Sequence, residues 1–146
     1  GRPRRKRHHE GNAQGREANE ENILADELLP LLCPGSHHFI SSTFANVDTL
    51  KAKEHAPTLR IHPDDAQTRH IRSGQRVRIS NERGECELVA DVTEDVRPGM
   101  LATTTVWWPS YSPDHHNVNW TTSDRLADFS GGSTFYTNLV KVEAIM

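Results

Sequence analysis

The residues best suited to ligand chemistry form a short run of hydroxyl side chains, Ser41, Ser42 and Thr43, followed by Phe44. Small hydroxyl groups can approach an anion closely, and each hydrogen bond to a charged acceptor contributes about 1.5–3 kcal/mol. An ordinary Ser/Thr loop with Asn46 in a turn explains the same residues without any ligand. The run is therefore a candidate anion site whose role depends on what surrounds it.

A second candidate lies downstream, where Asn117 and Asn119 flank a valine. A carboxamide offers both a donor and an acceptor, which suits the polar edge of a base or a ribose. Asn119 is our preferred candidate, although an asparagine that precedes a helix also serves as a plain turn residue. The triplet Asn119-Trp120-Thr121 also fits an N-glycosylation sequon, which we interpret as coincidental.

The sequence contains none of the common phosphate-binding or metal-binding motifs. It has neither G-x-G-x-x-G after a strand nor G-x-x-x-x-G-K-[ST], so any nucleotide must bind to loops of another fold. Cys33, His37 and His38 form a loose C-x-x-x-H-H pattern, which the histidines at 115–116 could complete. Adjacent histidines rarely ligate one ion together, and no C-x-x-C is present. We therefore predict no metal site, and we assign no catalytic residue.

The segment His62-Pro63-Asp64-Asp65 combines residue types that are common in active sites. A structural role explains them better, because proline suits the first turn of a helix and carboxylates suit its positive end. We predict a short helix here that ends at Ser73-Gly74, since glycine commonly terminates helices.

The elements that must position the candidate residues are short. Apolar runs and alternation predict strands at 28–33, 59–62, 76–80, 85–92, 101–106 and 139–145. Leu139 and Ile145 are expected to reach the core from the last strand. A second short helix is predicted through 121–126, and residues 107–116 are predicted to form a long surface loop. This pattern is typical of a mainly-β barrel.

Size and composition allow one domain with a modest core, since the chain has 146 residues and 34% of them are hydrophobic. Residues 1–22 contain no Leu, Ile, Val, Phe, Tyr or Trp, so we predict a disordered leader or linker there and a folded domain at 23–146. The leader is basic, but a net charge of -3 argues against nucleic-acid binding. No apolar run approaches the ~20 residues that span a bilayer, so no membrane partner is predicted.

The order of these motifs resembles the C-terminal dinucleotide-binding domain of molybdopterin oxidoreductases, the family of DMSO reductase and formate dehydrogenase. The stretch from Thr58 to Met100 carries most of the resemblance, with the hydroxyl run upstream and Asn117-Val118-Asn119 downstream. It covers roughly residues 28 to 145. In this family, two pyranopterin guanine dinucleotides hold a molybdenum or tungsten ion. The resemblance implies a double-psi β-barrel with one or two short helices.

The resemblance also implies which residues contact the cofactor, molybdopterin guanine dinucleotide. They are Cys33, Gly35, Ser41, Ser42, Thr43, Phe44, Trp107, Trp108, Asn119, Tyr136 and Thr137. One tryptophan of the pair is expected to pack on the barrel, and the other to face the cofactor or the parent enzyme. Thr121 stands where the family commonly has leucine, which we expect to weaken local packing.

The implied function is to bind the dinucleotide and orient the metal, with no turnover from this chain alone. The implied partners are the remaining catalytic domains of a parent oxidoreductase, with its iron–sulfur and molybdenum-binding regions, and we expect a cytoplasmic location. The alternative is a stand-alone double-psi barrel that binds protein or nucleic acid, which only the basic leader favours. A pyruvoyl decarboxylase with the same barrel would need self-cleavage at a Gly-Ser bond, and Gly35-Ser36 lies too early.

Overall fold

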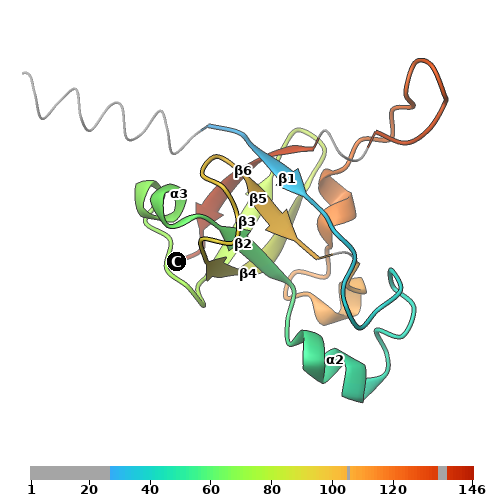
Figure 1. The fold of residues 1–146 in the computed structure, drawn as a ribbon, viewed down its shortest axis with the longest axis horizontal. Helices are drawn as coiled ribbons and strands as arrows, with labels where there is room; N and C mark the ends of the chain where they lie inside the picture. Colours follow the sequence, from blue (N-terminus) through green and yellow to red (C-terminus); the bar gives the residue numbers. More distant parts are fainter. Residues whose placement is uncertain (1–26, 105, 135–137) are drawn as a thin grey trace, which may run out of the picture.

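The computed structural model describes residues 27–104, 106–134 and 138–146, which form a closed six-stranded barrel (Figure 1). The strands are β1 (Leu29–Leu32), β2 (Thr58–Ile61), β3 (Arg76–Ser80), β4 (Glu85–Val92), β5 (Leu101–Thr103) and β6 (Leu139–Ala144). They close in the order β1-β5-β2-β4-β3-β6. The pairs β1–β5 and β2–β4 are parallel and the others are antiparallel. The predicted fold class, a mainly-β double-psi barrel with short helices, is confirmed.

Alternation along the strands fills the barrel interior. Val77 and Ile79 on β3 are fully buried, as are Val140 and Val142 on β6. Complete burial of such a side chain stabilises the fold by roughly 1.5–3 kcal/mol. Leu139, which we expected in the core, is 46% exposed because it occupies the outward phase of the same alternation. The prediction for this residue was wrong.

Helix α3 (Pro63–Thr68) begins as predicted, with Pro63 in its first turn and His62 as its N-cap. The Nδ1 atom of His62 accepts a hydrogen bond from the backbone N–H of Asp64 at 3.2 Å. The helix ends at Thr68, earlier than the predicted stop at 73–74. His70 adopts a left-handed φ of 54°, and the Ile71 N–H donates to the Ala66 carbonyl at 2.8 Å. This is a Schellman ending in which histidine takes the position that glycine usually holds.

Four other elements differ from the predictions. Helix α2 (Asp48–Glu54) was not predicted, since none of its residues is buried and no side chain caps its start. The predicted helix through 121–126 is absent, and the turn lies earlier, as the 3₁₀ helix η2 (Val118–Thr121). Another 3₁₀ turn, η1 (Pro109–Tyr111), interrupts the predicted surface loop, and β5 ends at Thr103 rather than continuing to 106.

Residues 1–26, 105 and 135–137 lie outside the described residues. The predicted leader at 1–22 and the proposed contacts Tyr136 and Thr137 therefore stay predictions. Within the described part of the chain, no helix is long and apolar enough to cross a membrane. Figure 1 shows residues 35–47, helix α2 and the segment 107–121 on the same side of the barrel, with α3 on the opposite side.

Candidate functional site

The hydroxyl segment 41–44 is a tight, exposed turn. The backbone N–H of Thr43 donates to the Ile40 carbonyl at 2.9 Å, and the Ile40 N–H donates back to Thr43 at 3.1 Å. Ser41 and Phe44 have left-handed φ values of 52° and 73°, a conformation that costs a residue other than glycine of order 1–3 kcal/mol. The hydroxyl groups of Ser41, Ser42 and Thr43 are all exposed and form no hydrogen bond with any described residue. The turn therefore presents three free hydroxyl donors together.

The two tryptophans of the pair have different roles. Trp107 is 4% exposed and packs edge-on against Phe39, with ring centroids 5.2 Å apart. Trp108 is 38% exposed, stacks on Tyr111, and donates a 2.8 Å hydrogen bond from Nε1 to the Ser42 carbonyl. Trp107 is thus the packing residue, and Trp108 is the outward residue that anchors the hydroxyl turn.

Asn117 organises the second candidate segment. Its Oδ1 accepts from the Asn119 N–H at 3.0 Å and starts η2, while its Nδ2 donates to the Trp107 carbonyl at 3.1 Å. Asn117 is only 8% exposed, so its carboxamide is committed to the fold. Asn119 is exposed, and its carboxamide has no partner among the described residues. Of the two asparagines, Asn119 is therefore the one that can bind a ligand.

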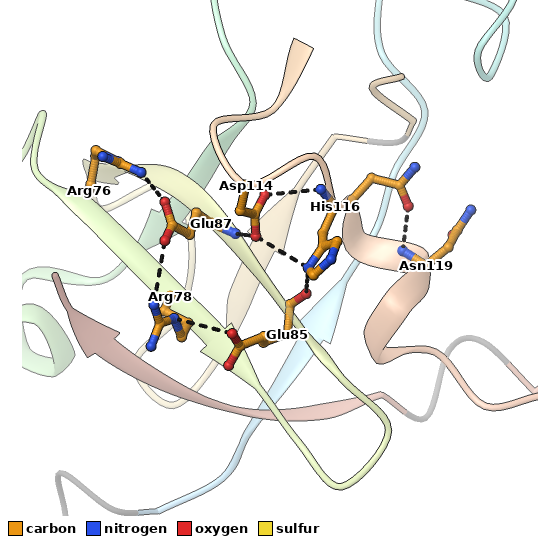
Figure 2. Close-up of polar contacts among 8 residues, drawn as sticks. Arg76, Arg78, Glu85, Glu87, Asp114, His116 and Asn119 are labelled. Carbon is orange, nitrogen blue, oxygen red and sulfur yellow. Dashed lines mark hydrogen bonds and ion pairs between the residues drawn. The ribbon is translucent and has the colours of Figure 1, made fainter. Parts of the chain in front are cut away.

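The segment before η2 is fixed to an open edge of strand β4 (Figure 2). Strand β2 pairs only with residues 89–92 of β4, which leaves the edge of its first half without a strand partner. Asp114 Oδ2 accepts from the Glu87 N–H at 2.9 Å, and His116 Nδ1 donates to the Glu85 carbonyl at 3.1 Å. The His116 ring also stacks on Trp120 at 5.2 Å. Side chains therefore satisfy main-chain groups that a neighbouring strand would otherwise pair.

Charged residues reinforce the same part of the barrel. The Glu87 carboxylate, whose side chain is 11% exposed, forms ion pairs with Arg76 and, at 3.5 Å, with Arg78 on β3 (Figure 2). Arg78 also lies 3.7 Å from Glu85. The Arg76 and Arg78 side chains are 53% and 40% exposed, so solvent screens these ion pairs and each contributes little to stability. We assign the cluster a structural role, because it joins β3 to β4.

A buried polar network holds η2 from the other side, and the sequence analysis missed it. Thr121 is fully buried and its Oγ1 accepts from Asn138 Nδ2 at 2.8 Å. Asn81, in the turn between β3 and β4, donates from Nδ2 to the Thr121 carbonyl at 2.8 Å. The threonine that we expected to weaken packing is thus a connecting residue. Thr121 has this role because its buried hydroxyl pairs with an asparagine far away in the sequence. No local sequence pattern predicts such a contact.

The two candidates at the end of β1 differ in what they offer. Cys33 is partly buried against the barrel core, and burial raises the pKa of its thiol to about 11, so the thiol stays protonated at neutral pH. Gly35 is exposed, and a Cβ there would meet no atom within 4 Å. Neither cysteine forms a disulfide. Among the described residues, no group of three or more His, Cys, Asp or Glu side chains could hold a metal ion.

Hydrogen bonds connect the remaining candidates on one side of the barrel. The chain of contacts runs from Ser42 to Trp108, and from Trp107 through Asn117 to Asn119. No acidic residue occurs at 39–47 or 115–123, so an anionic ligand would meet no repelling carboxylate within either segment. The donor set of hydroxyls, amides and an aromatic face fits a pyrophosphate with an attached base and sugar.

Comparison with known proteins identifies the family. Residues 29–139 match the model of the molydopterin dinucleotide binding domain. The chain belongs to this family. It is 41% identical over 125 residues to the probable oxidoreductase YoaE of Bacillus subtilis, covering 84% of this chain and 18% of that protein. It is 39% identical over 124 residues to the dimethyl sulfoxide reductase DmsA of Escherichia coli, covering 80% and 15%.

A solved structure shares the fold. Acetylene hydratase from Pelobacter acetylenicus superposes with a TM-score of 0.73 at 18% identity, over 88% of this chain and 20% of that chain. The present chain thus spans a fifth or less of the proteins that it matches. It is a molybdopterin dinucleotide-binding domain of the kind found in DMSO-reductase-family oxidoreductases, as the resemblance implied. The comparisons give no support to the stand-alone module.

Proposed function

We propose that this domain binds the guanine dinucleotide end of a pyranopterin cofactor and thereby orients a molybdenum or tungsten ion held by the rest of a larger oxidoreductase. The observation that carries the proposal is the arrangement of Ser41, Ser42, Thr43 and Asn119. Their side chains are exposed and free of partners, while Trp108 and Asn117 hold the segments that carry them.

Each group has a role that follows from its chemistry. The hydroxyls of the 41–43 turn donate to the pyrophosphate oxygens, since hydroxyl donors to a charged acceptor form the stronger class of hydrogen bond. Asn119 reads a polar edge of the guanine or ribose through paired donor and acceptor atoms. The exposed faces of Phe44 and Trp108, 46% and 38% exposed, provide apolar surface for a flat group.

The cofactor, when bound, supplies the redox chemistry, and this chain supplies position and charge balance. None of its residues takes part in a chemical step. The rigid supports of the site, namely the β4 edge and the Thr121 network, keep the donors in place before the ligand arrives. Such preorganisation reduces the entropy that binding would otherwise cost. We infer no turnover from the domain by itself.

Cofactor content of the complete catalytic subunit tests the proposal. We expect the variant with Ser41→Ala, Ser42→Ala and Thr43→Val, and separately Asn119→Ala, to release less GMP per polypeptide after acid hydrolysis. The matched control is Thr49→Ala, which removes an exposed hydroxyl from helix α2. Each lost hydrogen bond should weaken binding roughly tenfold.

A titration with GDP, followed by residue-resolved amide NMR shifts of the chain, locates the contacts independently. The proposal predicts shifts at 41–44 and 117–121, with smaller ones for ADP. Undiminished GMP content in both variants, together with GDP shifts confined to other parts of the barrel, would show that the ligand binds elsewhere.

A further inference from the structure

Residues 126–133 form a closed loop, here termed the Phe129 arm, that projects away from the barrel (Figure 1). Leu126 and Ser133 form a β-bridge at its base. Within it, the Ala127 N–H donates to the Gly132 carbonyl at 2.7 Å, and the Gly131 N–H donates to the Ala127 carbonyl at 2.9 Å. The arm is therefore closed at its base by internal main-chain bonds.

The arm exposes the largest apolar side chains of its sequence. Phe129 is fully exposed, at 106%, and Leu126 is 65% exposed. A phenylalanine ring gains free energy by leaving water, and aromatic anchors in fitted pockets dominate many interfaces. A closed loop that displays such a ring has the features of a docking element, because its shape is set before the partner binds.

Arginine side chains at the base of the arm indicate that a docking partner carries negative charge there. An open cavity of about 230 Å³ lies there, lined by Arg83, Arg125 and Thr134 among others. Arg83 pairs with Glu82 at 2.9 Å, whereas the guanidinium of Arg125 forms no ion pair with any described residue. A surface complementary to this region therefore carries an apolar socket beside at least one carboxylate.

The length of the relatives indicates which partner could carry the complementary surface. The family match runs from residue 29 to 139 and includes the arm, yet the chain spans only 18% and 15% of YoaE and DmsA, the two relatives quoted above. We propose that the Phe129 arm anchors this domain to the remaining part of the same catalytic subunit, with Phe129 in an apolar socket and Arg125 beside an acidic residue. This inference rests on the proposed function, because it assumes the larger oxidoreductase.

Hydrogen exchange of the complete catalytic subunit tests the anchor. Amides 126–133 should exchange slowly in the wild type and at least about tenfold faster in Phe129→Ser, as expected from the loss of a buried aromatic side chain. Phe129→Leu should retain much of the protection, and Arg125→Glu should lose part of it. Glu94→Gln, a polar change in an exposed turn outside the arm, is the matched control and should behave like the wild type.

Two outcomes would overturn the anchor. The first is fast exchange of the arm in the wild type, or slow exchange that Phe129→Ser leaves unchanged. The second is protection that rises with protein concentration, since the socket would then belong to a second copy. GMP content separates this failure from that of the proposed function: normal content with an unprotected arm refutes only the anchor, whereas content unaffected by the site variants refutes the cofactor site.

Discussion

Gly84 offers a sharp test of how η2 is held, because it sits in the turn between β3 and β4 against the backbone of that helix. A Cβ at this position would lie 2.6 Å from the Trp120 carbonyl oxygen, 0.8 Å short of the 3.4 Å at which ordinary contact begins. The atom that must yield belongs to main chain, and Asn81 fixes the neighbouring Thr121 carbonyl at 2.8 Å. Gly84→Ala therefore forces η2 to move.

The magnitude follows from two opposing effects. Overpacking costs about 1–3 kcal/mol, while replacing glycine by alanine stabilises by about 0.4–1 kcal/mol through the unfolded chain. We expect a net loss of about 1–2 kcal/mol in the free energy of unfolding, measured by urea denaturation. Gly35→Ala is the matched control: no atom lies within 4 Å of its Cβ, so it should be neutral or slightly stabilising.

The displaced turn should also weaken GDP binding, because η2 carries Asn119. Equal stability of Gly84→Ala and the wild type, or a gain that matches Gly35→Ala, would refute the close approach of the turn to η2. If Gly84→Ala loses stability as expected but binds GDP with unchanged affinity, then η2 is not part of the GDP-binding site.

Three further predictions concern buried groups. Thr121→Val deprives Asn138 of its acceptor and should cost about 1–3 kcal/mol in urea unfolding, with Thr121→Ser largely neutral. Burial raises the pKa of Glu54, but hydrogen bonds from His38 outweigh this effect, and the net result is a pKa below the usual 4.5. The ionised carboxylate therefore stabilises the fold, and this contribution is lost as the pH falls below 4.5. We expect the melting temperature of Glu54→Gln to fall less than that of the wild type over this pH range. Burial, followed by nearby negative charges, raises the pKa of Cys86 to about 12, so stability should fall as the pH rises above 9.0, and less steeply in Cys86→Ala.

The barrel strands could be predicted because burial imposes a local signal on them. Val77 and Ile79 alternate with arginines along β3, and the turn at 81–84 separates them from a second alternating run. Such a pattern needs no knowledge of the partner strand. The closing order of the strands did not follow from it, since the parallel pairs join segments far apart in the sequence, and only the family resemblance implied that arrangement.

The helical elements were harder to predict because their ends depend on single residues in unusual roles. His70 ends α3 in a left-handed conformation that sequence patterns assign to glycine. Helix α2 has no fully buried residue, so its apolar periodicity is weak. Leu50 packs against the small cluster that includes Trp107. Glu54 contacts His38, whose Nδ1 lies 2.9 Å away. The sequence could not predict this contact, because the two side chains are sixteen positions apart.

The candidate site likewise combines residues that the local sequence predicts with supporting contacts that it does not predict. Sequence reasoning could select Asn119 and the hydroxyl run, because free polar groups in loops are visible as residue types. It could not separate Trp107 from Trp108, since adjacent residues of one type differ only in what packs on them. The supports from β4 and Asn138 come from 17 to 31 residues away. The side chains that would contact the ligand can thus be recognised from their residue types. The residues that hold those side chains in place can be identified only from the folded barrel.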